Sequence, residues 1–427
     1  MISKSEACKG GAPVHYQTVY SREIYHGLPT FDESHNGQTA IITGANGISG
    51  YAQLQVLAQS PQRWTKIYCL SRRPPAVPGG LPPQAEFIQC DFLKSPEEIG
   101  EVLKKSGVKA DHIFFFAYIQ PPPKEGGGIW SAADELTTVN KLLLDNFLGA
   151  LDFAHIKPKR FMLQTGAKNY GGHLGPTKVP QQESDPRVLL EPNFYYAQED
   201  SLWDWCRQRS VSWNIAMPSY IVGAVPDAAM NIAFPLAVYA LVSKYLGEPL
   251  RYTGDIVSWQ MTQTQSNAFM NAYLEEWMVL TPKAANQKFN ALDDSAFSWE
   301  GLWPKIAECY DLEWEGPDED AEYTEVPVRY GAPRGYGNNC LLARYKFTTA
   351  AWAQQPKVCS AWREIARQHK LAWPELKDTD RLTDKARKLG FHGYVDTAES
   401  FLHTFEGLAQ LRMIPPVPKT NVEYTTL

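Results

Sequence analysis

The sequence predicts an α/β protein with a doubly wound parallel sheet and a mainly helical C-terminal region. Three observations support this prediction. Short apolar runs alternate with helix-length segments between about residues 39 and 218, glycines follow the first apolar run directly, and helical patterns dominate after about residue 225. Strands that alternate with helices of this length are typical of βαβ units, in which neighbouring strands run parallel.

The elements of the first part follow one another in a regular order. Residues 1–36 are polar and lack a sustained period, so we interpret them as an N-terminal arm. Ser95 is placed to cap the second predicted helix. The apolar runs predict strands at 39–44, 65–72, 86–91, 111–119, 160–166 and 211–218, separated by helices at about 51–60, 95–107, 140–154 and 194–208.

The second part, residues 226–427, is expected to form a mainly helical cap that binds substrate, with some segments returning to the first domain. Helices are predicted within 231–247, 264–278 and 298–310, and tryptophans recur at 299, 303, 352, 362 and 373. The acidic segment 313–325 and the glycine-rich loop 330–339 are expected to face solvent. The apolar segment 234–247 fits a core, a cap or an interface, which leaves a homodimer open.

Composition excludes several classes of function. The chain has 427 residues, a formal net charge of −6 and a pI of about 5.9, which argues against a nucleic acid or an anionic membrane as partner. The seven cysteines and nine histidines are dispersed without ligand spacing, so we predict no metal site and no disulfide framework. The N-terminus lacks an apolar signal core, and prolines and polar residues interrupt the longest apolar region, 220–242. We therefore expect a cytoplasmic protein that is not inserted in a membrane.

The turn after the first predicted strand reads TGANGISG and places Gly44, Gly47 and Gly50 three residues apart. One glycine suits the tight turn, one suits close approach of the backbone to a pyrophosphate, and one suits close helix–strand packing. The following helix N-terminus offers oriented N–H groups to the phosphates. Together with Asn46 and Ile48, these glycines predict the phosphate site of a dinucleotide.

The ends of the next two strands indicate which dinucleotide binds to this Rossmann-type domain, which we assign to residues 37–225. The second strand ends with Ser71, Arg72 and Arg73, where an NAD-binding site usually carries an acid. Guanidinium groups suit the 2′-phosphate of NADPH or NADP⁺, although two solvated arginines are the simpler alternative. Asp91 ends the third strand and is a candidate contact for the adenine, or else a helix cap.

A lysine and two tyrosines stand close to a predicted strand end and a predicted helix start. Lys168 closely follows the end of a strand in QTGAKNYGGHLGP, and the helix that begins NFYYAQED carries Tyr195 and Tyr196. The positions four residues after these tyrosines hold Glu199 and Asp200, so the helix carries no lysine there.

These motifs together resemble a known family. TGANGISG, SRRP, QCDF, LQTGAKNY, FYYAQED, YIVGAVPDAAMN and FNALDDSAF occur in the order found in extended short-chain dehydrogenases/reductases. More closely, the chain resembles the progesterone 5β-reductase/iridoid synthase-like (PRISE-like) family from about residue 39 to about residue 415. In most short-chain dehydrogenases the catalytic lysine follows the tyrosine by four residues on one helix, and neither Glu199 nor Asp200 can replace a lysine. The resemblance implies that the catalytic lysine has moved to the loop after the preceding strand, where Lys168 lies.

The resemblance also implies roles for individual residues. Tyr195 would be the acid or oxyanion donor, with Tyr196 as the alternative. Lys168 would hold the nicotinamide ribose and lower the pKa of the tyrosine. In the reduction of an enone, Tyr195 would stabilise the enolate oxygen.

The backbone of Tyr220, Ile221 and Val222 would flank the nicotinamide, to which Tyr195 would also lie close. Tyr118 and Tyr170 are candidate substrate contacts, although a structural role suits Tyr170 equally.

The chain departs from the family at several positions. Asn169 stands in place of the histidine in the usual lysine–histidine–tyrosine pattern, and two extra glycines precede the following Leu-Gly-Pro. Met217 and Ser219 stand where plant members carry Arg-Pro-Gly. Ala117 and Tyr118 replace a threonine–tryptophan pair of the plant enzymes. We therefore expect the chemistry to be shared and the substrate to differ.

The resulting expectation is an NADPH-dependent reductase that acts on the activated C=C or the C=O of a small apolar compound, such as a secondary metabolite. The same fold also hosts isomerases and cyclases, so a step without net redox change is an alternative. A non-catalytic NADP-binding sensor is a third possibility, but such a sensor would not need Tyr195 and Lys168 together.

Overall fold

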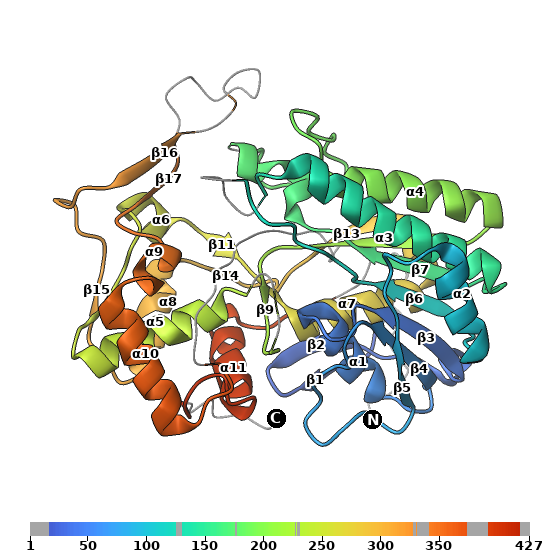
Figure 1. Cartoon of the computed structure of the whole chain (residues 1–427), viewed down its shortest axis with the longest axis horizontal. Coiled ribbons are helices and arrows are strands. Elements are labelled where there is room, and N and C mark those ends of the chain that lie inside the picture. The colour runs from blue at the N-terminus through green and yellow to red at the C-terminus, as the bar shows by residue number, and fades with distance from the viewer. Residues whose placement is uncertain are drawn as a thin grey trace, which may run out of the picture.

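The computed structural model describes residues 17–124, 130–175, 177–226, 228, 231–327, 330, 341–373 and 392–418. Its centre is a seven-stranded sheet with the strand order β13-β8-β7-β6-β3-β4-β5. All neighbouring strands of this sheet are parallel, so the predicted doubly wound α/β fold is confirmed (Figure 1). The strands are β3 (Gln38–Thr43), β4 (Trp64–Ser71), β5 (Ala85–Gln89), β6 (His112–Phe115), β7 (Arg160–Gln164), β8 (Ser212–Pro218) and β13 (Gln287–Ala291).

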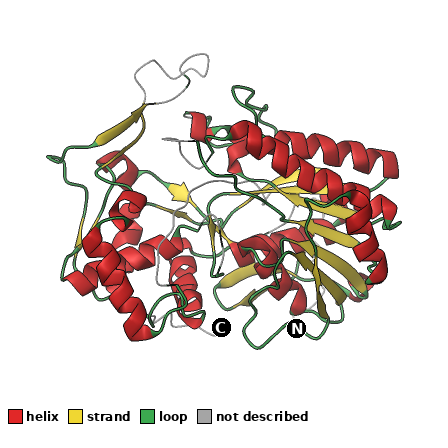
Figure 2. Cartoon of the chain, in the orientation of Figure 1, coloured by secondary structure: helices red, strands yellow, loops and turns green. Residues whose placement is uncertain are grey.

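Helices cover both faces of the sheet (Figures 1 and 2). On one side lie α2 (Pro96–Lys105), α3 (Ala133–Phe153) and α4 (Phe194–Arg209), and on the other lie α1 (Ile48–Ala58) and α7 (Ala268–Leu280). Successive residues of β3 point to opposite faces, as the strand period of two requires. Ile41 packs in the core with Phe115 and Phe147, whereas Ile42 packs in the other core with α1 and α7.

The two strands that neighbour β3 in the sheet, β4 and β6, lie on opposite sides of it. β4 and β5 extend the sheet in one direction, and β6, β7, β8 and β13 extend it in the other. The strand order therefore reverses between β3 and β6, and a crevice forms at the carboxyl ends of the strands at such a switch point. The predicted glycine turn follows β3 at this position.

The helical cap packs beside this edge of the sheet (Figure 2). Four of the tryptophans that recur in the predicted cap are buried in its aromatic core, namely Trp299, Trp303, Trp352 and Trp362. α5 lies in this core, with only Tyr245 among its large apolar side chains exposed. The cap helices are α5 (Ala233–Leu246), α6 (Ile256–Gln260), α8 (Trp299–Cys309), α9 (Thr349–Ala353), α10 (Pro356–His369) and α11 (Thr397–Gln410).

Short strand pairs also form outside the seven-stranded sheet, in the second half of the chain. The pairs are β9 (Ile221–Val222) with β12 (Ser266–Asn267), β10 (Leu250–Arg251) with β15 (Trp314–Glu315), β11 (Gln263–Thr264) with β14 (Ala296–Phe297), and β16 (Thr324–Pro327) with β17 (Leu341–Tyr345). The segment 264–278 was predicted as one helix, but strands β11 and β12 precede α7. α7 and β13 come from the second half of the chain and complete the sheet domain.

Residues 17–36 differ from the expected irregular arm. They form a hairpin of β1 (Val19–Arg22) and β2 (Tyr25–Pro29), followed by the short helix η1 (Glu33–His35). Tyr25 and Leu28 are buried, and the ring of Tyr25 lies 6.0 Å from that of Phe269 on α7. Strands this short do not show a clear hydrophobic period, so only the packing on α7 reveals them. Residues 1–16 lie outside the described residues.

None of the helices in the described ranges combines the length and apolar character that crossing a membrane requires.

Candidate active site

The glycine turn after β3 has the shape that the sequence predicted. Gly44 has a φ of +63°, a conformation that favours glycine, and a Cβ atom there would lie 3.0 Å from the backbone of Phe116. A Cβ on Gly50 would lie 2.4 Å from the carbonyl oxygen of Gly44, so α1 packs directly on the turn. These two glycines are therefore required by contacts within the fold.

The first turn of α1 suits an anion. Gly47 is the N-cap residue and makes no side-chain hydrogen bond, and the turn contains no acidic residue. The first N–H groups of a helix have no partner within the helix, so here they are open to a ligand such as a pyrophosphate. Asn46 and Ile48 are partly exposed beside them. The residues present thus fit a dinucleotide.

The two predicted arginines lie at the end of β4, next to β3 in the sheet. The side chains of Arg72 and Arg73 are exposed, and the backbone carbonyl oxygens of both residues accept hydrogen bonds from neighbouring side chains. The hydroxyl of Ser71 donates to the carbonyl oxygen of Arg73 at 2.7 Å, and Gln89 donates to that of Arg72 at 3.2 Å. The guanidinium groups are therefore carried on a defined turn at the edge of the crevice.

Asp91 takes part in a local turn. Its carboxylate accepts the N–H of Leu93 at 3.0 Å, and its carbonyl oxygen accepts the N–H of Lys94 at 3.1 Å. The side chain remains partly exposed after β5. The helix cap is Ser95, whose side chain accepts the N–H of Glu98, as predicted.

The candidate catalytic pair lies beyond β7 and at the start of α4. Lys168 is buried in the short helix η2 (Ala167–Tyr170), and Tyr195 belongs to the first turn of α4. The two elements meet at Gly166, where a Cβ atom would lie only 2.8 Å from the Tyr195 hydroxyl. The fold therefore places the phenol directly over the strand end that leads to the lysine.

Aromatic rings surround the lysine. Its ammonium lies 5.3 Å from the ring centroid of Phe194 and 5.5 Å from that of Trp130. Such rings attract a cation and limit access of water to it. Trp130 also packs edge-on against His173, at 5.5 Å between ring centroids. Neither residue was predicted as part of the site: Trp130 lies outside the motifs of the sequence, and His173 lies within QTGAKNYGGHLGP without a ligand spacing to mark it.

Burial governs the acidity of the tyrosine. It raises the pKa of Tyr195, because the phenolate would lose the hydration that the exposed group has. This direction is opposite to the lowering expected from Lys168. In this structure Tyr195 is therefore a protonated hydrogen-bond donor at neutral pH.

Tyr118 lies beside the same phenol. Its ring packs 5.6 Å from that of Phe194, and its hydroxyl donates to Gln120. Burial raises the pKa of Tyr118, and the neighbouring Tyr195 adds to the effect. Tyr118 thus borders the predicted site, at the end of β6.

Tyr170 has a different environment. Its side chain is buried, and its hydroxyl donates to the side chain of Asn290 on β13 at 2.6 Å. This contact joins η2 to the edge strand of the sheet and fits the structural alternative considered for this residue.

Glu199 and Asp200, four residues after the two tyrosines, form ion pairs with other residues than Lys168. The Glu199 carboxylate is fully buried and pairs with Arg187 at 2.9 Å and Lys288 at 2.5 Å. Asp200 is exposed and also pairs with Arg187. These acids therefore stabilise the packing of α4 and leave Lys168 as the cation of the pair.

The segment after β8 lies along the same edge. Tyr220 is buried, and its backbone carbonyl oxygen accepts the N–H of Ser266 at 3.1 Å. Ile221 and Val222 form β9, which pairs with β12. Ser219 also donates from its backbone N–H to the Ser266 hydroxyl at 2.7 Å. The backbone predicted to flank the nicotinamide is thus held by the segment that begins α7.

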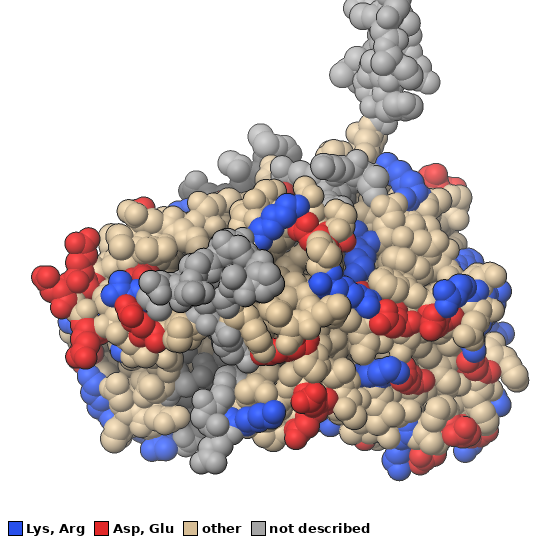
Figure 3. Space-filling view, turned by 90° about the horizontal axis from the view of Figure 1, so that it is seen from above, with Lys and Arg blue, Asp and Glu red and all other residues tan. Residues whose placement is uncertain are grey.

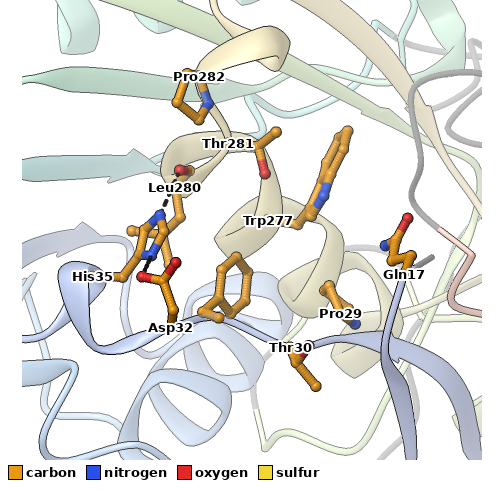
Figure 4. A pocket seen from close by; sticks show the side chains of 10 residues that line it. Gln17, Pro29, Thr30, Asp32, His35, Trp277, Leu280, Thr281 and Pro282 are labelled. Carbon is orange, nitrogen blue, oxygen red and sulfur yellow. Dashed lines mark hydrogen bonds and ion pairs between the residues drawn. The ribbon is translucent and has the colours of Figure 1, made fainter. Parts of the chain in front are cut away.

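A separate hollow of about 200 Å³ lies at the opposite end of α7. Figure 4 shows Trp277 and Leu280 on one side and Thr30 on the other, with His35 bridging between Asp32 and the carbonyl oxygen of Leu280. This hollow is remote from the carboxyl edge that carries the glycine turn. It contains none of the predicted site residues.

On the face drawn in Figure 3, basic and acidic side chains are interspersed over the described residues, with no continuous basic field. Within the described ranges no three histidine, cysteine or acidic side chains gather as a metal site would require.

Comparisons with known proteins agree with this fold. The family described as "PRISE-like Rossmann-fold domain" matches residues 40–332. An uncharacterised protein of Schizosaccharomyces pombe is 31% identical over 411 residues, which cover 89% of this chain and 98% of that protein.

Two plant relatives have named activities. An (S)-8-oxocitronellyl enol synthase of Catharanthus roseus is 26% identical over 88% of this chain and 92% of its own length. A 3-oxo-Delta(4,5)-steroid 5-beta-reductase of Arabidopsis thaliana is 26% identical over 88% of this chain and 93% of its own length.

Among solved structures, MoeE5 in complex with UDP-glucose and NAD superimposes with a TM-score of 0.54. The match covers 88% of this chain and 99% of MoeE5 at 15% identity, so it concerns the fold alone.

Proposed function

Because this chain belongs to the family of proteins with a PRISE-like Rossmann-fold domain, we propose that it is an NADPH-dependent reductase of a conjugated carbonyl compound. The substrate is small and largely apolar, and the reduced bond is the C=C next to the carbonyl group. One observation carries the proposal. A Cβ atom on Gly166 would lie 2.8 Å from the Tyr195 hydroxyl, so the phenol lies at the strand end whose following short helix carries Lys168.

The dinucleotide would lie at the carboxyl ends of the strands, at the switch point of the sheet. The N-terminus of α1 would hold the pyrophosphate through backbone N–H groups, since the N-cap Gly47 leaves them uncapped by side chains. Arg72 and Arg73 would bind the 2′-phosphate, which distinguishes NADPH from NADH. When bound, the reduced nicotinamide supplies a hydride.

Lys168 and Tyr195 would have separate roles in the reaction. Lys168 would hold the ribose next to the nicotinamide, with Trp130 and Phe194 keeping water from its ammonium. Tyr195, protonated because burial raises its pKa, would donate a hydrogen bond to the carbonyl oxygen of the substrate. Negative charge develops on that oxygen during addition to the β-carbon, and a positioned donor stabilises it more than water does.

The surroundings support an apolar conjugated substrate. Phe194 packs against the Tyr195 ring, Tyr118 packs against Phe194, and Trp130 lies beside Lys168. This aromatic surface suits a compact hydrophobic compound. The names of the two plant relatives point the same way, since one describes formation of an enol and the other reduction of a steroid with a conjugated 3-oxo group. The aromatic border differs in this chain, so the substrate need not be shared.

The test is consumption of NADPH by the purified protein with a panel of enals, enones, saturated aldehydes and ketones. We expect turnover only with conjugated carbonyls, and saturated carbonyl products by mass spectrometry and NMR. Tyr195→Phe and Lys168→Met should each lower kcat by about 100-fold or more, as loss of a proton donor or positioning group does. Alcohol products would show a carbonyl reductase instead. Full activity of both variants would refute the assignment of the pair.

A further inference from the structure

The two proposed catalytic groups are carried by different elements, so no single helix fixes the distance between them. Where the lysine follows the tyrosine by four residues, a single turn of helix fixes their separation. Here Lys168 belongs to η2, whereas Tyr195 belongs to α4. Their relative position depends on contacts between η2 and α4.

Tyr196 makes the main contact of this kind. Its ring is buried at 6% exposure, and its hydroxyl donates to the carbonyl oxygen of Asn169 at 2.5 Å. The same hydroxyl accepts the N–H of Val188 at 2.8 Å. The residue next to Tyr195 is thus bonded to the residue next to Lys168.

Asn193 makes a second contact between the same elements. Its side-chain oxygen accepts the N–H of Tyr195 at 3.2 Å and caps α4. Its amide nitrogen donates to the carbonyl oxygen of Lys168 at 3.2 Å. One buried side chain therefore touches the backbone of both catalytic residues.

Ion pairs hold the segment that carries Arg187 and Val188 next to Tyr196. Arg187 lies 4.9 Å from the Tyr196 ring and donates to its carbonyl oxygen at 3.3 Å. The same guanidinium pairs with the buried Glu199, which also binds Lys288 on β13. This pairing anchors the segment whose Val188 N–H completes the hydrogen bonds of the phenol.

From these contacts we propose that Tyr196 and Asn193 are positioning residues that hold Lys168 in register with Tyr195. The Tyr196 hydroxyl is directed away from the proposed reaction, because it is hydrogen-bonded to the backbone of Asn169 in η2 and of Val188 in the segment before α4. It acts on the reaction through the placement of the lysine. The proposal rests on the proposed function for its kinetic part, but NADPH binding tests it separately.

The test is Tyr196→Phe in two backgrounds, the natural chain and Lys168→Met. In the natural chain we expect kcat to fall about tenfold, because small misplacements of a catalytic group are costly, with KM for the carbonyl compound within about twofold. We expect the dissociation constant of NADPH, measured by fluorescence, to rise about fivefold, since a displaced lysine loses part of its hold on the ribose. In the Lys168→Met background both effects should shrink to less than about twofold, because coupled residues are not additive.

A matched control separates positioning from general loss of stability. Tyr273→Phe removes another buried phenol, which donates to Gln59 at 2.8 Å on the opposite part of the sheet domain. It should lower the Tm like Tyr196→Phe while kcat and NADPH affinity stay unchanged. If Tyr196→Phe does not fold, Asn193→Ser keeps a capping side chain, removes the bond to Lys168, and should show the same dependence on background.

The outcomes are distinct. Equal losses of Tyr196→Phe in both backgrounds, or no loss in either, would overturn the positioning role. If the natural chain binds NADPH but reduces no compound of the panel, the proposed reaction fails, and the binding measurements alone decide the positioning role.

Discussion

Gly166→Ala offers a direct test of how closely the tyrosine approaches the strand end. A Cβ atom at this position would lie 2.8 Å from the Tyr195 hydroxyl, whereas ordinary contacts begin at 3.4 Å. The phenol would therefore have to move by about 0.6 Å, the difference of these two distances. The φ of 170° is extended backbone, which alanine adopts without strain.

The size of the effect follows from this displacement. A misplacement of about 1 Å can cost about 100-fold in rate, so a movement of roughly half that size should lower kcat about tenfold. NADPH affinity should change little, because the added methyl group faces the phenol and the carbonyl oxygen of Pro218. The assay is kcat with a conjugated carbonyl compound, together with NADPH binding and the Tm.

Gly172→Ala is the matched control in the same loop. The nearest atom to its Cβ would be a methyl carbon of Thr177 at 3.9 Å, so the substitution meets no obstacle. We expect unchanged kcat for this variant. Full activity of Gly166→Ala, or an equal loss in both variants, would refute the reasoning about the phenol.

Three further predictions concern the cofactor site and the base of the cap. Gly50→Ala should weaken NADPH binding more than about 100-fold, since its Cβ would lie 2.4 Å from a backbone oxygen and must displace the phosphate turn; unchanged affinity in a fluorescence titration would contradict this. Replacing Arg72 and Arg73 together by alanine should lower the NADPH-over-NADH preference in kcat/KM by about 10- to 100-fold, as loss of charge-assisted hydrogen bonds predicts, and an unchanged ratio would assign the 2′-phosphate elsewhere. Burial raises the pKa of Asp293 from 3.8 to about 7, so the folded protein retains a proton that the unfolded chain releases. Stability should therefore fall as the pH rises from about 4 to 7 and then level off, by at most about 4 kcal/mol from this group. Asp293→Asn should flatten this dependence in urea unfolding between pH 5 and 8, and an unchanged slope would exclude the aspartate as its source.

Much of the fold was accessible from local patterns. Buried parallel strands are continuous apolar runs, so TAIITG and RFML indicated β3 and β7 before any contact was known. The glycine turn could also be predicted from the sequence. Gly44 adopts a positive φ and Gly50 packs on the carbonyl oxygen of Gly44, and both requirements arise within a segment of seven residues. The hairpin at 19–29 and strand β13 were not predicted, since both are short and depend on distant partners.

The candidate site divides in the same way. The sequence by itself determined which residue types are available: a lysine after a strand, tyrosines at a helix start, and arginines at a strand end. Only the tertiary structure decided that Gly166 admits the Tyr195 phenol, that Trp130 and Phe194 enclose Lys168, and that burial raises the pKa of the tyrosine. The reason is physical, because distances and desolvation depend on atoms that lie far apart in the chain, whereas turns and periods depend on neighbours.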